Sequence, residues 1–172
     1  MVNEAHKIHG TYPVATAALG RLLTGAALMG ATLKNESDSI TLQIRGDGPL
    51  GALTAVTDSR SHVRGCVDDP LVERPLNAKG KLDVGGGVGH GTLSVIRDLG
   101  LKEPYIGQVP LVSGEIAEDL TAYFASVSST HLLKACARDS KGYRRGYPLA
   151  GYRAYGHELK LKWGGAPHGS YG

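Results

Sequence analysis

Cysteine, aromatic residues and long apolar runs are all scarce in this chain of 172 residues. Its two cysteines, Cys66 and Cys136, lie far apart, which excludes a disulfide framework and favours a reducing compartment. No uninterrupted apolar run approaches the roughly 18 residues that a membrane-spanning helix requires. A basic start followed by an apolar stretch and a cleavage site is also missing, so no secretory signal is predicted. These absences predict a cytoplasmic protein without a membrane span.

Residue clusters that support catalysis or metal binding are missing as well. Adjacent carboxylates occur at Asp68–Asp69 and Glu118–Asp119, but neighbours on a strand or helix point apart and form no acid–base pair. No serine lies in the context of a nucleophile elbow. The histidines are scattered, without a pair four residues apart beside a carboxylate; they are His6, His9, His62, His90, His131, His157 and His168. We therefore predict no catalytic, cofactor-binding or metal-binding residues and no enzyme activity.

The glycine-rich stretch Val84–Gly91 is the nearest approach to a ligand site. Such stretches can hold phosphate through backbone N–H groups. Here no Gly-Lys-Ser or Gly-Lys-Thr follows, and His90 stands where the last glycine of the dinucleotide-binding pattern belongs. We interpret the stretch as a structural turn, and a nucleotide-binding enzyme is the third-ranked alternative.

The residues that are present predict one ordered domain followed by a different segment. Apolar residues make up 41% of the chain and charged residues 20%, as in soluble globular proteins. Residues 127–172 carry a net charge of +6 and six of the ten aromatic residues, which leaves −3 for residues 1–126. We predict a core domain at 1–126 and a basic tail, rich in tyrosine and glycine, at 127–172. The tail has few aliphatic residues, so most of Lys141–Gly172 is predicted to be disordered.

A long helix rich in glycine and alanine is the first large element that the pattern predicts. A short helical turn, Asn3–His9, ends at Gly10, and Pro13 then begins a helix that continues to about Lys34. Three glycines interrupt it, and each costs about 1 kcal/mol of helix propensity relative to alanine; they are Gly20, Gly25 and Gly30. Close approach of the helix to a sheet would offset that loss. A membrane dimer face is the alternative, and Arg21 argues against it.

Alternating apolar residues predict strands at 40–45, 52–57, 62–67, 92–97 and 105–112. Ser113-Gly114 then turns the chain into a helix at 115–125, whose apolar stripe is predicted to face the core; the stripe is Ile116, Leu120, Tyr123 and Phe124. Acidic residues in its first turn suit the positive end of the helix dipole; they are Glu115, Glu118 and Asp119. The predicted fold class is α+β: a mixed, mostly antiparallel sheet packed by the long helix and a second, shorter helix.

Several blocks, in order, resemble one protein family. They are Pro13–Thr24, Leu42–Leu50, Gly80–Val84, Asp98–Tyr105 and Gly107–Phe124. Together they are similar to the N-terminal core of the redox-regulated heat-shock chaperones of bacteria, the zinc-holding 33 kDa chaperonins. The resemblance implies an ATP-independent holdase of the stress response, which captures unfolded client proteins on an apolar sheet surface. It leaves the client-binding residues unknown.

In this family a linker and a zinc domain are implied to cover that surface until oxidation releases it. The zinc ligands form a Cys-x-Cys plus Cys-x-x-Cys quartet, which this chain lacks, so no cofactor is expected. Cys66 lies in a strand pattern and is predicted to be a small buried apolar residue. Without the covering parts, the chain is expected to bind clients constitutively or to misfold and self-associate.

Both ends of the chain depart from the family pattern. Family members place a strand hairpin before the equivalent of Val2–Ala5, so we expect an unpaired sheet edge that invites homo-oligomers. Back-translating Val127–Leu133 and reading in the frame that starts at the third base of the Val127 codon gives Glu-Gln-His-Pro-Ser-Ala, which resembles the family's continuation. The hypothesis is that the tail is an out-of-frame translation and the core is incomplete. An RNA-binding protein acting through the basic aromatic tail is the alternative, because cations contact phosphates while aromatic rings stack on bases.

Overall fold

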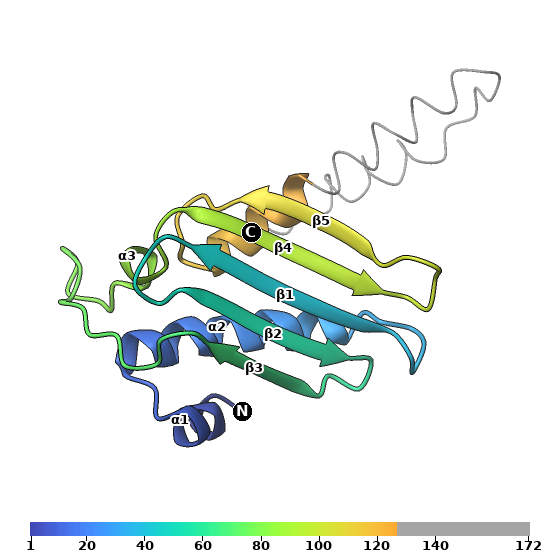
Figure 1. Cartoon of the computed structure of the whole chain (residues 1–172), viewed down its shortest axis with the longest axis horizontal. Helices are drawn as coiled ribbons and strands as arrows, with labels where there is room; N and C mark the ends of the chain where they lie inside the picture. Colours follow the sequence, from blue (N-terminus) through green and yellow to red (C-terminus); the bar gives the residue numbers. More distant parts are fainter. Residues whose placement is uncertain (127–172) are drawn as a thin grey trace, which may run out of the picture. The chain divides into compact units, whose positions relative to one another are not determined.

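The computed structural model describes residues 1–126, which form a five-stranded sheet with helices on one side (Figure 1). The sheet order is β3-β2-β1-β4-β5, and every neighbouring pair is antiparallel. The strands are β1 (Ser39–Gly46), β2 (Ala52–Asp58), β3 (Val63–Val67), β4 (Gly91–Asp98) and β5 (Tyr105–Pro110). The helices are α1 (Val2–His9), α2 (Pro13–Gly30), α3 (Val84–Val88) and a helix at residues 117–126. The predicted α+β class is confirmed.

The alternation of the strands decides which face of the sheet is buried. Ile40, Leu42 and Ile44 of β1 are almost completely buried, while the residues between them are half-buried. Their neighbours in register on β2 and β4 include Ala55 and Val95, which are equally buried. The apolar side chains therefore share one face, and α2 and the helix at 117–126 cover that face (Figure 1).

The turn between β2 and β3 is held by one carboxylate. Asp58 accepts hydrogen bonds from the backbone N–H groups of Arg60 and His62, both at 2.9 Å. The bond from the His62 backbone is the largest cause that holds the pKa of Asp58 below its ordinary value. The aspartate thereby fixes the register of the hairpin.

The long helix ends earlier than its sequence predicts, at Gly30 rather than near Lys34. The chain tightens there, because the N–H of Thr32 bonds the carbonyl of Met29 at 3.0 Å. The hydroxyl of Thr32 donates to the same carbonyl at 2.7 Å. These bonds satisfy the last carbonyl groups of the helix and stop its propagation.

The three glycines of α2 allow close approach of three different elements. A Cβ atom at Gly30 would fall 2.7 Å from the backbone oxygen of Asp58 on β2, so this glycine does admit the sheet. A Cβ at Gly20 would instead meet Val2 of α1 at 2.8 Å, and one at Gly25 would meet Leu120. Contact with the sheet, the predicted reason for all three, is therefore the reason at Gly30 alone.

The turn from β5 into the last described helix is built around Asp119. Its buried carboxylate accepts from the backbone N–H groups of Val112 at 2.7 Å, Ser113 at 3.0 Å and Ile116 at 3.0 Å. Asp119, predicted to interact with the helix dipole, caps the turn and is fully buried. Ile116 lies in the left-handed region, with φ of 56°, which is unusual for a β-branched residue.

Three further predictions are corrected, two about the burial of side chains and one about a backbone turn. Phe124 of the predicted core stripe is 44% exposed, although the other three members are buried. Cys66 is exposed, because β3 is an edge strand and its alternation turns this side chain away from the helices. The stretch Val84–Gly91 holds a short helix, α3, rather than a simple turn, because the carboxylate of Asp83 accepts from the backbone N–H of Gly86 at 3.1 Å and caps it.

Contrary to expectation, the segment Pro13–Gly30 is long and apolar enough to cross a membrane by length and composition. It is 56% buried in the fold, and the core helix of a soluble protein meets the same criterion. The predictions made for residues 127–172, including the basic tail, its disorder, Cys136 and the reading frame, lie outside the described residues.

Candidate functional site

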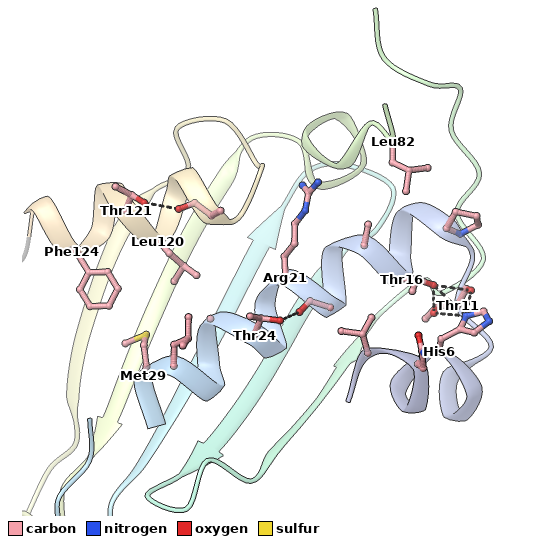
Figure 2. Close-up of a pocket in the computed structure, with 18 of the residues that line it drawn as sticks. His6, Thr11, Thr16, Arg21, Thr24, Met29, Leu82, Leu120, Thr121 and Phe124 are labelled. Atoms are coloured by element: carbon pink, nitrogen blue, oxygen red, sulfur yellow. Dashed lines mark hydrogen bonds between the residues drawn. The ribbon is translucent and has the colours of Figure 1, made fainter. Parts of the chain in front are cut away.

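An apolar groove runs along the side of α2 that faces away from the sheet (Figure 2). Helix α1 forms one wall, and the helix at 117–126 forms the other. The cavity volume is about 990 Å³. We call it the α2 groove; its lining residues are Val2, Asn3, His6, Thr11, Pro13, Thr16, Ala17, Gly20, Arg21, Thr24, Gly25, Leu28, Met29, Thr32, Leu82, Arg97, Ala117, Leu120, Thr121 and Phe124.

Small residues on α2 create this depression. Ala17, Gly20 and Gly25 line the groove along α2, and the two glycines let Val2 of α1 and Leu120 of the last described helix approach α2 closely. Leu28 stands beyond them, with 70% of its surface exposed, and Phe124 faces the groove from the opposite wall (Figure 2). The glycines that weaken the helix thus also shape a concave apolar surface.

Threonines in the groove do not make it polar, because their hydroxyl groups bond to the nearby backbone. Thr24 donates to the carbonyl of Gly20 at 2.8 Å, and Thr121 donates to that of Ala117 at 2.8 Å (Figure 2). Such bonds to the preceding turn use up the hydroxyl group within the helix. The groove is therefore more apolar than its residue types suggest.

A hydrogen-bonded cluster closes the end of the groove where α1 meets α2 (Figure 2). The hydroxyl groups of Thr11 and Thr16 lie 2.6 Å apart. Nδ1 of His6 lies 2.9 Å from the carbonyl oxygen of Thr11 and, as the donor, fixes the tautomer of the ring. The cluster thereby holds α1 against the start of α2.

The middle of the groove is bordered by an ion pair. Arg21 of α2 bonds the carboxylate of Glu115, which also accepts from the backbone N–H of Gly85 at 3.3 Å. Glu115, expected to interact with a helix dipole, instead links α2 to α3 and to the turn before the last described helix. Both partners are about one-third exposed or more, so this pair contributes little to stability.

The opposite face of the sheet is not covered by the described helices (Figure 1). It carries one largely apolar row across the strands. Thr41 pairs with Val56 on β2 and with Ile96 on β4, and Ile96 pairs with Ile106 on β5. The neighbouring row is polar, with Thr54, Gln43, Ser94 and Gln108. The expected apolar sheet surface is thus limited to one row, since half-exposed antiparallel strands place polar residues toward water.

The adjacent carboxylates Asp68 and Asp69 bond separate parts of the backbone. Asp68 accepts from the N–H of Ala52 at 2.9 Å, whereas Asp69 accepts from that of Leu71 at 2.9 Å. Among residues 1–126, no three His, Cys, Asp or Glu side chains are grouped to hold a metal ion. The described part, with the single cysteine Cys66, therefore does not offer the four thiolates of the implied zinc centre.

Sequence patterns alone missed the groove, because it combines residues from five separate segments. The glycine and alanine positions of α2 are the one feature of the sequence that points to the groove. The sequence alone attributes them to contact with the sheet. Neither the threonine bonds nor the packing of α1 against Gly20 can be inferred from spacing.

Comparison with known proteins gives consistent matches. A family model described as Hsp33 protein matches residues 1–131. The 33 kDa chaperonin of Acetivibrio thermocellus is 61% identical over 125 residues, which cover 73% of this chain and 42% of that protein. The 33 kDa chaperonin of Ruminiclostridium cellulolyticum is 57% identical over 126 residues, 73% of this chain and 43% of that protein. The chain thus spans less than half the length of these relatives.

A solved structure shares the fold. The crystal structure of the 33 kDa chaperonin (heat shock protein 33 homolog) from Thermotoga maritima superposes with a TM-score of 0.70 at 53% sequence identity. The match covers 73% of this chain and 43% of that one. The two proteins therefore share both the fold and about half of the aligned residues.

Proposed function

Because the chain belongs to the Hsp33 family, we propose that it is a molecular chaperone that holds unfolded polypeptides without ATP, and that apolar client segments bind in the α2 groove. The groove itself supports this proposal: it is apolar, open along a whole helix, and the hydroxyl groups of Thr24 and Thr121 already have backbone partners. The relatives carry the name chaperonin, which supports the general activity. We place the activity in the cytoplasm and do not propose an enzymatic role.

Hydrophobic burial would supply the binding energy. Transfer of one large aliphatic side chain from water contributes about 1.5–3 kcal/mol, so about three such side chains contribute roughly 6 kcal/mol. Losses of chain entropy reduce that value. The expected dissociation constants lie near or above roughly 100 μM for one segment. Binding this weak is reversible and depends on apolar character rather than on a defined sequence, as the holding of unfolded chains requires.

The test compares three substitutions that each add one negative charge. Leu28→Glu places it in the groove, and Ile106→Glu places it on the uncovered sheet face, where Ile106 is 61% exposed. Leu101→Glu, at a residue that is 70% exposed and does not line the groove, is the matched control. Each variant of the full chain is mixed with a heat-denatured client, and aggregation is followed by light scattering.

We expect the unchanged protein to suppress scattering, Leu28→Glu to suppress it several-fold less, and both other variants to match the unchanged protein. A loss confined to Ile106→Glu would place client binding on the sheet and refute the groove assignment. No suppression by any soluble preparation would refute the holdase proposal itself. The alternative, RNA binding through residues 127–172, lies outside the described residues.

A further inference from the structure

Arg97 brings a positive charge into the otherwise apolar end of the α2 groove. It lies on β4, in register with Ile40 on one side and Tyr105 on the other. Its side chain shares the helix-facing side of the sheet with the buried residues Val95 and Leu93, two and four positions earlier. It lines the groove, as do Met29 and Phe124.

Within the described part of the chain, Arg97 is half-buried, and one nitrogen of its guanidinium is buried without a partner. Nε of Arg97 is buried without a hydrogen bond, and so is the hydroxyl group of Tyr123 on the adjoining helix. Burial raises the pKa of Tyr123, and the nearby positive charge of Arg97 opposes that shift, which indicates that the two groups are close. Buried polar groups in folded proteins are normally bonded, so an unbonded Nε and an unbonded tyrosine hydroxyl side by side are unusual.

Other arginines with described partners have acidic ones. Arg21 bonds Glu115, Arg60 bonds Glu36 at 2.9 Å, and Arg74 bonds Asp83 at 2.8 Å. No residue lining the α2 groove is an aspartate or a glutamate, so residues 1–126 supply no acid for Arg97 inside it. The groove therefore combines a long apolar surface with one unneutralised cation at its end.

We propose that the α2 groove selects client segments in which a carboxylate accompanies the apolar residues, and that Arg97 binds this carboxylate. The proposal rests on the groove being the client site. A carboxylate can accept two parallel hydrogen bonds from a guanidinium. An aspartate or glutamate at one end of an apolar stretch would thus bind Arg97 while the apolar residues lie along α2. The occupant is a peptide rather than a single acyl chain, because α2 is about 27 Å long and the groove follows it, room for roughly eight extended residues.

The test uses three ten-residue peptides of leucine, alanine and serine that differ in one residue beside the apolar stretch: glutamate, glutamine or lysine. Both peptide termini are blocked, so that the varied residue alone carries charge. Binding to the full chain is measured by fluorescence anisotropy. A bond from a charged donor predicts that the glutamate peptide binds about tenfold more tightly than the glutamine peptide, with the lysine peptide weakest.

Variants of the protein then locate the carboxylate. Arg97→Met keeps an apolar stem without charge and is expected to bind the glutamate and glutamine peptides equally. Arg97→Lys should restore part of the preference. Arg45→Met removes the same charge from the exposed face of the sheet and should leave the tenfold preference unchanged. Circular dichroism checks that each variant is folded, and the comparison of peptides on the unchanged protein stands without any variant.

Equal binding of the glutamate and glutamine peptides would overturn the charge selection while leaving the groove as a client site. A glutamate preference that persists in Arg97→Met would also overturn it, because the carboxylate would then bind elsewhere. Failure of all three peptides to bind would refute both this inference and the proposed function.

Discussion

Replacing Asp119 with alanine is expected to destabilise the fold by about 3 kcal/mol, although the residue is remote from the sheet core. The carboxylate accepts three backbone N–H groups, of which that of Ile116 is fully buried. Leaving a buried donor without its acceptor costs about 1–3 kcal/mol. The N–H groups of Val112 and Ser113 are part-buried and can bond water instead, so each adds roughly 0.5 kcal/mol.

The assay is urea unfolding of the full chain, followed by far-ultraviolet circular dichroism. A loss of this size lowers the urea midpoint by roughly 1–3 M at the slopes typical of small domains. Glu118→Ala is the matched control: it removes the same charge from the same helix turn, and Glu118 is exposed. The control should stay within about 0.5 kcal/mol of the unchanged protein.

The same variant connects stability to function. Asp119 positions the helix at 117–126, and that helix supplies Leu120, Thr121 and Phe124 to the groove. We therefore expect Asp119→Ala to weaken suppression of client aggregation as well. If Asp119→Ala and Glu118→Ala lowered the midpoint equally, the loss would come from the helix dipole rather than from the three backbone bonds, and our explanation of the turn would be wrong.

Three shorter predictions test other features of the fold. In urea unfolding, Gly30→Ala should lower the free energy of unfolding by about 1–3 kcal/mol, because the added Cβ would collide with the backbone of β2. Gly25→Ala should be neutral or stabilising, because its Cβ would meet only the flexible end of Leu120 and alanine has the higher helix propensity. The hydrogen bond from Arg74 holds the pKa of Asp83 below its ordinary value. The ionised carboxylate therefore stabilises the fold above the ordinary pKa of aspartate, and this contribution is lost as pH falls through the lowered pKa of Asp83. Asp83→Asn should accordingly make the free energy of unfolding fall less steeply at acid pH. Cys66 should react with a maleimide in the native state as fast as in urea, with mass spectrometry locating the adduct; protection would contradict its exposure.

Much of the fold could be predicted because local patterns and packing agree. The alternation of Ile40, Leu42 and Ile44 identified the buried face of β1, and Pro13 marked the start of α2. Gly10, with φ of 61°, ends α1 as the sequence indicated. In each of these cases the information lies within a few residues of the element that it specifies.

The errors share a different cause, since they concern contacts between segments far apart in sequence. Asp119 is buried because the end of β5 folds back over its own helix, which helix periodicity does not reveal. Cys66 is exposed because β3 lies at the edge of the sheet, and sheet order is a property of the whole chain. The candidate site was missed for the same reason: Arg97 gains its proposed role only because Met29 and Phe124, from distant segments, line the same groove.

The two edges of the sheet differ in how many backbone groups they leave open to another chain. The expected self-association through these edges stays a prediction. At the β3 edge, Nε2 of His9 in α1 donates to the carbonyl of Gly65 at 3.0 Å, so part of that edge already has a partner. At the β5 edge, the N–H of Leu111 donates to the carbonyl of Gly91 on β4. Because every second residue of an antiparallel strand bonds the same neighbour, the backbone groups of Ile106 and Gln108 point away from β4, toward the open edge.

Prolines limit what the β5 edge can accept. Pro104 and Pro110 share the outward parity of Ile106 and Gln108, and neither has an N–H to donate. An added strand could therefore receive N–H donors from only two residues of this edge, Ile106 and Gln108, which weakens edge pairing. Any stable dimer of this core would need side-chain contact as well, and the apolar row that ends at Ile106 is the adjoining surface able to provide it.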